Sequence, residues 1–224
     1  MTHITFGIFA HPDDAAFGPS GTLALAACDG DVHLICATSG GAGTNTAEHK
    51  NLAAVREAEE QAAANILNVA SCKLLRYDDG RLCNESYLEI ANKIIAHIRS
   101  ITDQSSNDHL QLITFDPNGL TGHIDHIVMS QITTYVYCKL RDEFDMRLKY
   151  FCTPAKLLPT KNTDWLYMPK GRSANEIDEV IDVRSVRNQK VAAIHAHKSQ
   201  VHDAQTHLAH GEALFDEHFM YYRD

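Results

Sequence analysis

An α/β fold, with helices on both faces of a mostly parallel sheet, is the architecture that the sequence predicts. Over the first two thirds of the chain, short apolar runs rich in β-branched residues alternate with longer stretches of helical spacing. Strands and helices in this alternation form right-handed βαβ crossovers, which place the strands parallel in one sheet. The length of 224 residues, with 44% hydrophobic and 22% charged residues, fits one domain with a substantial core.

The parallel part of the sheet is predicted from five strands and four helices. Predicted strands cover 4–10, 32–38, 72–77, 110–115 and 148–153, and predicted helices cover about 19–28, 47–68, 85–101 and 124–140. The helix at 47–68 can bury one side, made of Leu52, Val55, Ala63, Ile66 and Leu67. The helix at 85–101 has Asn84 as its cap and a buried stripe of Leu88, Ile94, Ile95 and Ile98. These elements define a Rossmann-like, three-layer α/β/α core over residues 1–153.

The chain beyond residue 153 has a different composition. Residues 154–176 are predicted to form loops with at most a short edge strand, because they contain Pro154, Pro159, Pro169, Gly171 and the single Trp. A strand at 176–183 and helices at about 184–197 and 202–210 come next. No linker marks a boundary, so we expect a single domain, 1–224, in which 154–224 supplies rim loops, an edge strand and C-terminal helices.

Composition excludes several classes of function. A net charge of −9 argues against binding to nucleic acid or to an anionic membrane, because phosphate recognition needs clustered Lys and Arg. No apolar run of about 18 residues predicts a membrane span, and the N-terminus lacks a secretory signal. The six cysteines form no C-x-x-C pair, so we expect reduced, mostly buried thiols in a cytoplasmic protein.

Polar residues stand directly after four of the predicted strands, and ligands of parallel sheets bind beyond the carboxyl ends of the strands. The four segments are His11-Pro12-Asp13-Asp14, "TSGGAG" (38–43), "YDDGRL" (77–82) and "FDPNGLTGHIDH" (115–126). We therefore expect their side chains to meet at one edge of the sheet.

His11, Asp14 and His126 would form a set of two histidines and one carboxylate, which leaves a fourth position open for water. Catalytic zinc typically has three protein ligands of this kind. A cation would also explain the adjacent aspartates, since Asp14 would bind it and Asp13 would remain free to act as general base.

His123 lies three residues before His126, so it can face the same site without binding the ion. Asp125 could hold His123 in one orientation and favour its charged form. Each segment alone has a simpler interpretation, since H-P-D-D can be a helix-capping turn and H-x-x-H is common. The presence of both segments at the ends of predicted parallel strands favours a metal site.

Four segments together resemble a known family. Ala10–Asp14 matches A-H-P-D-D-E, Gly122–His126 matches G-H-x-D-H, and "REAEEQAAANIL" (56–67) and "KVAAIHAHKSQ" (190–200) match two further motifs in the same order. The chain thus resembles the LmbE-like, or PIG-L-type, family of zinc-dependent N-acetylglucosaminyl deacetylases. The matches span about 200 residues.

The resemblance implies an activity and a role for each matching residue. The activity is metal-dependent removal of the N-acetyl group from a small molecule that contains N-acetylglucosamine, which releases acetate and a free amino sugar. The implied cofactor is Zn²⁺, with Fe²⁺ as an alternative, and trimers or hexamers would suit the family. The implied roles are metal ligands for His11, Asp14 and His126, proton transfer for Asp13, charge stabilisation for His123 with Asp125 as its partner, and substrate contacts for Arg56, Asp79 and His197.

The chain departs from the family pattern at two positions. Ala15 replaces the usual Glu after H-P-D-D, which predicts altered support around the metal rather than its loss, and Ile124 replaces a common Pro. Rival functions are a zinc amidohydrolase acting on a non-sugar amide, a metal-binding protein without catalysis, and a nucleotide-binding module that uses "SGGAG".

Three further residues or segments have alternative interpretations. Arg56 could pair with Glu59 or Glu60 on a solvated helix face. His195 is expected to be structural, and the "QVHDAQTH" segment is expected to form a surface or subunit-contact helix.

Overall fold

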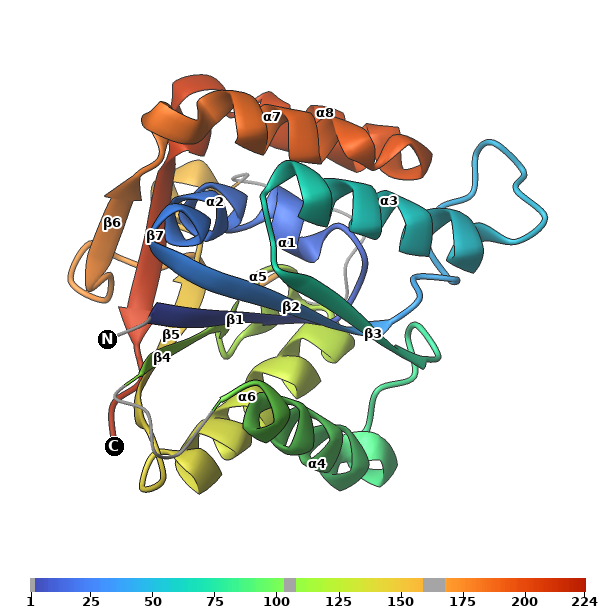
Figure 1. Ribbon diagram of the computed structural model, residues 1–224. Coiled ribbons are helices and arrows are strands. Elements are labelled where there is room, and N and C mark those ends of the chain that lie inside the picture. The colour runs from blue at the N-terminus through green and yellow to red at the C-terminus, as the bar shows by residue number, and fades with distance from the viewer. Residues whose placement is uncertain (1–2, 103–107, 159–167) are drawn as a thin grey trace.

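The computed structural model describes residues 3–102, 108–158 and 168–224, which form a seven-stranded sheet between two layers of helices (Figure 1). The strand order is β3-β2-β1-β4-β5-β7-β6. The strands are β1 (His3–Phe9), β2 (Gly30–Thr38), β3 (Ser71–Tyr77), β4 (His109–Phe115), β5 (Asp145–Cys152), β6 (Glu179–Asp182) and β7 (Asp216–Tyr221). Strands β1 to β5 pair in parallel, which confirms the predicted α/β fold.

The longer helices divide between the two faces of the sheet, with α2, α3, α7 and α8 on one side and α4 and α6 on the other (Figure 1). The α-helices are α1 (Asp14–Phe17), α2 (Ser20–Asp29), α3 (Leu52–Ile66), α4 (Asn84–Ile101), α5 (Gly119–Gly122), α6 (Ile124–Leu140), α7 (Arg187–Ala196) and α8 (Val201–Leu208). Short 3₁₀ turns are η1 (Ala155–Leu157), η2 (Arg184–Val186), η3 (Lys198–Gln200) and η4 (Gly211–Phe215). No helix of the described residues combines the length and the apolar character that crossing a bilayer requires.

Burial explains the apolar runs of the central strands. Phe6 and Ile8 of β1, Leu110 and Leu112 of β4 and Val32 of β2 are almost fully inaccessible. Helices cover both faces of a parallel sheet, so its inner strands carry apolar residues on both sides rather than in alternation. The polar residues of the candidate site follow the carboxyl ends of these strands.

The helix boundaries differ from the prediction in detail. α3 begins at Leu52 rather than near residue 47, and Cys83 rather than Asn84 occupies the N-cap of α4. Leu88, predicted to be buried, is 56% exposed. It lies near the start of α4, where Leu82 and Tyr87 pack against the core instead.

The C-terminal region contains a strand that the sequence did not predict. β7 (Asp216–Tyr221) lies antiparallel between β5 and β6, so the predicted strand at 176–183 becomes the sheet edge as β6. β7 begins with polar residues, so a search for apolar runs does not find it. Its Glu217 is nevertheless buried, because the side chain pairs with Lys190. Pro159 and Trp165, on which the loop prediction partly depends, lie outside the described residues.

Candidate active site

Three side-chain donor groups converge at the carboxyl edge of the sheet, from the segment after β1 and the first turn of α6. His11 Nδ1 lies 3.1 Å from His126 Nε2 and 3.4 Å from Asp14 Oδ2, and His126 Nε2 lies 3.2 Å from Asp14 Oδ1. These side chains are at most 12% exposed. A tetrahedral ion with bonds of about 2.0–2.1 Å would hold its ligand atoms at about this spacing. The donor set therefore fits a divalent metal ion.

The far nitrogen of each imidazole is held by the protein. His11 Nε2 lies 3.0 Å from Asp79 Oδ1 and 3.2 Å from Asp125 Oδ2, and His126 Nδ1 lies 3.0 Å from the carbonyl oxygen of Gly119. Protons on these far nitrogens would leave the lone pairs of His11 Nδ1 and His126 Nε2 available to a metal ion beside Asp14. Hydrogen bonds of this kind fix the tautomer and orientation of metal-binding histidines.

Negative charge dominates the surroundings of His11. Burial opposes protonation of His11, but the charge of Asp14 and hydrogen bonds to Asp125, Asp14 and Asp79 outweigh it and raise the pKa to about 12. In Asp14, burial would raise the pKa, but the nearby His126 and His11 hold it well below its usual range. This cluster of carboxylates thus strongly favours a positive charge at its centre.

His123 joins the cluster, but its partner differs from the expected one. Its ring centroid lies 4.7 Å from that of His11, and the nitrogens of His11, His123 and His126 could converge on one ion. The carboxylate of Asp125 accepts the N–H groups of Gly80 (2.8 Å) and Leu82 (3.2 Å), while the backbone N–H of Asp125 donates to His123 Nδ1.

The protonation of His123 also differs from the expected charged form. Burial and the charges of His11 and His126 lower the pKa of His123. Since His123 Nδ1 accepts a hydrogen bond from the backbone of Asp125, the remaining ring proton lies on Nε2. Both observations favour a neutral His123 that donates from Nε2.

Asp13, next to the donor set, is held in an unusual backbone conformation. Its φ of 109° lies in a region that non-glycine residues rarely adopt, at a cost of about 1–3 kcal/mol. Arg56 donates to Asp13 Oδ2 and to the carbonyl oxygen of Pro12, both at 2.7 Å, and Glu60 Oε2 accepts the Asp13 N–H at 3.1 Å. These contacts from α3 compensate for the strain.

Arg56 is buried, at 4% exposure, so the alternative of a solvated helix face is wrong. Its guanidinium also donates to the carbonyl oxygen of Gly40 at 2.8 Å. A Cβ at Gly40, where φ is +66°, would lie 2.6 Å from the guanidinium carbon. The glycines of the "SGGAG" loop thus make room for Arg56.

Asp79 and His197 lie at different depths. Asp79 reaches the cluster, because its Oδ1 faces His11 and its Oδ2 accepts the N–H of Ala42 at 3.0 Å. His197 is only 1% exposed, its Nε2 lies 3.7 Å from Glu60 Oε2, and its ring edge contacts Phe17. Burial lowers the pKa of His197 to about 4. His197 is therefore a neutral side chain buried beside Glu60 and Phe17, which does not favour a direct substrate contact.

Glu60 is a functional candidate that was not among the predicted site residues, where it appeared only as a possible partner of Arg56. It is 2% exposed, and burial raises its pKa to about 7, against the lowering effect of the Asp13 N–H. The available signal was the spacing, because residues four apart share one helix face. If Arg56 is buried, Glu60 is therefore expected on the same buried face of the helix.

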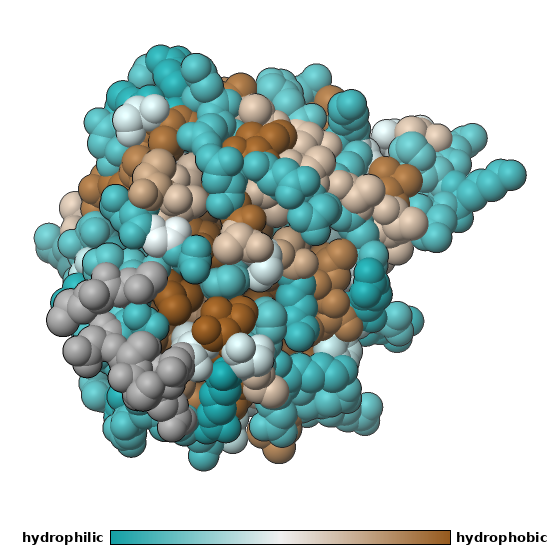
Figure 2. Space-filling view, viewed as in Figure 1, coloured by the Kyte–Doolittle hydropathy of each residue, from teal (hydrophilic) through white to brown (hydrophobic). Residues whose placement is uncertain are grey.

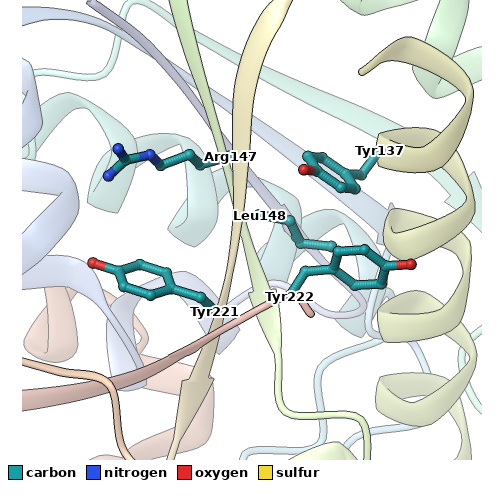
Figure 3. Close-up of a pocket in the computed structure, with 5 residues that line it drawn as sticks. All are labelled: Tyr137, Arg147, Leu148, Tyr221 and Tyr222. Atoms are coloured by element: carbon teal, nitrogen blue, oxygen red, sulfur yellow. The ribbon is translucent and has the colours of Figure 1, made fainter. Parts of the chain in front are cut away.

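Two surface hollows lie away from this cluster. One, of about 390 Å³, is lined by Tyr137, Arg147, Leu148, Tyr221 and Tyr222 near the start of β5, at the opposite edge of the sheet from the cluster. Figure 3 shows Arg147 and Tyr221 on one side of β5 and Tyr137 and Tyr222 on the other. Neither hollow includes a residue of the cluster.

The second hollow runs between α3 and α7, where Figure 2 shows pale and brown residues within a largely hydrophilic face. Half of its lining residues are alanines. His195, expected to be structural, is exposed and lines this hollow.

The fold and the cluster together define an α/β protein with a His/Asp metal-type site at the carboxyl edge of a parallel sheet. Residues 7–137 match the family model described as PIG-L, GlcNAc-PI de-N-acetylase. The chain belongs to the PIG-L family, which confirms the resemblance inferred from its motifs.

Relatives by sequence in this family are deacetylases. The chain is 28% identical to the 1D-myo-inositol 2-acetamido-2-deoxy-alpha-D-glucopyranoside deacetylase of Rhodococcus erythropolis, over 87% of this chain and 80% of the relative. It is 26% identical to a probable N-acetyl-alpha-D-glucosaminyl L-malate deacetylase 2 of Bacillus cereus, over 86% and 81% of the two chains. These relatives deacetylate different N-acetylglucosaminides.

Solved structures share the fold at lower identity. The N,N'-diacetylchitobiose deacetylase of Pyrococcus horikoshii has a TM-score of 0.70 at 19% identity, covering 98% of this chain and 83% of that one. GalB, the 4-carboxy-2-hydroxymuconate hydratase of Pseudomonas putida, has a TM-score of 0.69 at 15% identity, covering 100% and 97%. Because a hydratase shares this fold, the activity must be argued from the site.

Proposed function

We propose that this protein is a metal-dependent N-deacetylase that removes the acetyl group from a small molecule containing N-acetylglucosamine. The convergence of His11 Nδ1, Asp14 and His126 Nε2 within 3.1–3.4 Å, beside the Asp13 carboxylate that Arg56 holds, is the observation that carries the proposal. The names of its relatives by sequence support the same reaction and substrate class.

His11, Asp14 and His126 are the proposed metal ligands, since the near nitrogens of the two imidazoles and the Asp14 carboxylate lie within 3.4 Å of one another. Zn²⁺ suits two imidazoles and one carboxylate, and Fe²⁺ is the alternative. A divalent ion there supplies Lewis acidity, which activates water and polarises the acetamide carbonyl. Asp79 and Asp125 orient His11 for this role.

Asp13 is the proposed general base, and Arg56 is the residue that orients it. Its carboxylate takes a proton from the attacking water and later returns this proton to the departing nitrogen, which leaves as the free amine. His123 donates from Nε2 to the oxyanion that develops on the carbonyl oxygen. The neutral form of His123 is sufficient for this hydrogen bond.

Direct substrate contacts by Arg56, Asp79 and His197 have weaker support. The terminal nitrogens of Arg56 donate to Asp13, Pro12 and Gly40, and Asp79 faces His11 and Ala42. These contacts favour roles in which Arg56 and Asp79 position other residues. The six unpaired cysteines agree with a cytoplasmic location, although only Cys36 and Cys152 are buried and the expectation of mostly buried thiols is wrong. A trimer or hexamer is a prediction.

Acetate release measured with metal content tests the proposal. The purified protein is assayed with N-acetylglucosamine linked to inositol, to malate and to a second sugar, and with a simple N-acetyl amine as the non-sugar control. We expect acetate from at least one glucosaminide, its loss after chelation, and its return with Zn²⁺ or Fe²⁺. Stoichiometric metal without acetate from any glucosaminide would refute the proposal, and acetate from the simple amide alone would favour a non-sugar amidohydrolase.

A further inference from the structure

Glu60 contacts the backbone of Asp13 from the buried face of α3. Its Oε2 accepts the Asp13 N–H at 3.1 Å, and its side chain is 3% exposed. Arg56, one turn earlier on the same face, holds the carbonyl oxygen of Pro12 and the carboxylate of Asp13. Two residues of one helix therefore hold both sides of the Pro12–Asp13 peptide group and the carboxylate of Asp13.

The conformation of Asp13 explains why such restraint is needed. With φ at 109° and ψ at −28°, Asp13 lies outside the regions that an unrestrained aspartate adopts. A relaxed backbone would turn both the N–H and the side chain of Asp13 to other directions. The Asp13 N–H points into the protein, where Glu60 Oε2 is its acceptor.

The surroundings of Glu60 are unsuited to a carboxylate that serves stability alone. Cys36 is buried nearby, and burial together with the charge of Glu60 raises the pKa of the Cys36 thiol. His197 lies 3.7 Å from Glu60 Oε2. Replacing a buried charged group with an apolar one of similar volume is often neutral or stabilising. A carboxylate kept in such a place is typical of a group that trades stability for activity.

We propose that Glu60 is a positioning residue that fixes the backbone of Asp13 and thereby the direction of the Asp13 carboxylate. The inference rests on the proposed role of Asp13 as the proton carrier. The chain has Ala15 where the family motif has a Glu, and the carboxylate that contacts the Asp13 backbone comes instead from Glu60 of α3.

Glu60→Gln, Glu60→Leu and Glu60→Met test the inference in the full-length, metal-loaded protein, with the glucosaminide that the wild type turns over best. Gln keeps an oxygen acceptor for the Asp13 N–H, whereas Leu and Met do not. Glu57→Gln is the matched control, because Glu57 lies on the same helix but pairs with the exposed Arg76. We expect Leu and Met to lower kcat on the order of 10²-fold, with KM and metal content close to wild type.

The expected pattern separates positioning from a structural role. Glu60→Gln should retain most of kcat, and the apolar variants should keep or raise the Tm while kcat falls. Unchanged kcat in a folded apolar variant, equal loss in Gln and Leu, or loss of metal would each overturn the inference. Having both Leu and Met guards against one variant that does not fold.

Amide hydrogen exchange at Asp13, followed by NMR, gives a readout that does not need turnover. Loss of the Glu60 acceptor should make this amide exchange faster in the Leu and Met variants, with little change in Gln and in the Glu57→Gln control. Equal exchange rates in all variants would overturn the inference. If the wild type releases no acetate, the proposed function fails, while this measurement still decides whether Glu60 holds Asp13.

Discussion

At the scale of single residues, the two adjacent aspartates after β1 have different surroundings and different chemistry. Asp14 faces His11 and His126, which hold its pKa well below the usual range. Burial raises the pKa of Asp13 well above its usual range, although the charge of Arg56 opposes this effect. Neighbouring carboxylates whose pKa values are pushed apart are typical of a ligand or charged group beside a proton carrier.

This difference predicts opposite effects of two substitutions. Asp13→Ala should retain the metal and lose acetate release by a factor on the order of 10²–10⁴, because general acid–base catalysis is removed. His126→Ala should lose the metal, since two protein ligands would remain. Metal analysis and acetate assays on the same samples check both effects, and the reverse pattern would refute the assignment of ligand and base.

At the scale of elements, the C-terminal strand β7 stabilises α2, the second helix after the aspartate pair. Glu217 of β7 accepts the N–H groups of Gly21 and Thr22 in the first turn of α2, and it pairs with Lys190 of α7 at 2.6 Å. Lys190 also donates to the carbonyl oxygen of Gly18 at 2.7 Å. The lysine of the "KVAAIHAHKSQ" motif thus connects α7, β7 and the turn after α1.

Both charges of this pair are almost fully buried, so removing one partner should be costly. We expect Lys190→Met and Glu217→Leu each to lower the free energy of unfolding by about 3–5 kcal/mol, because each leaves a buried charge unpaired. Glu217→Leu should cost more, since it also leaves two N–H groups of α2 without an acceptor. Urea unfolding of both variants and of the double variant measures this. A double variant that shows the full sum of the single effects would contradict a coupled pair.

At the scale of the whole molecule, a half-buried histidine links stability to pH. His207 of α8 stacks on Phe17 of α1, with ring centroids 4.9 Å apart. Burial, with the neighbouring charges of His210 and Lys190, lowers the pKa of His207 from 6.5 to about 4. The unfolded chain therefore binds this proton more readily than the folded chain does. The stabilising contribution of neutral His207 is present above pH 6.5 and is lost as the pH falls towards about 4.

Replacement of His207 by Asn should remove this part of the pH dependence. We expect the free energy of unfolding to fall less steeply from pH 6.5 to 4 in His207→Asn than in the wild type. Urea unfolding at several pH values, compared as a difference between the two proteins, measures this. The difference between the two proteins is used because Glu60, with its pKa raised to about 7, contributes a pH dependence of opposite sign to that of His207. This contribution is present in both proteins and cancels in the difference. Parallel curves would contradict the prediction.

Much of the candidate site was predictable because its residues stand at strand ends. His11, Asp14 and His126 each come soon after a buried parallel strand, and carboxyl ends of parallel strands meet at one edge. Their convergence within 3.4 Å agrees with that expectation. The pairing of Asp125 with His11 was not predictable, because Asp125 lies beside His123 in the chain and 114 residues from His11.

The sequence by itself determined the alternation of strands and helices, the parallel core and the segments that carry the site residues. These depend on local periodicity and on the polar residues that stand at the end of each strand. Only the tertiary structure decided the contacts across the layers of the fold. These include β7 between β5 and β6, the Lys190–Glu217 pair, and the contact of Glu60 with the Asp13 backbone. Lys190 and Glu217 lie 27 positions apart in the chain, and Glu60 and Asp13 lie 47 positions apart. Only packing brings these residues together in space.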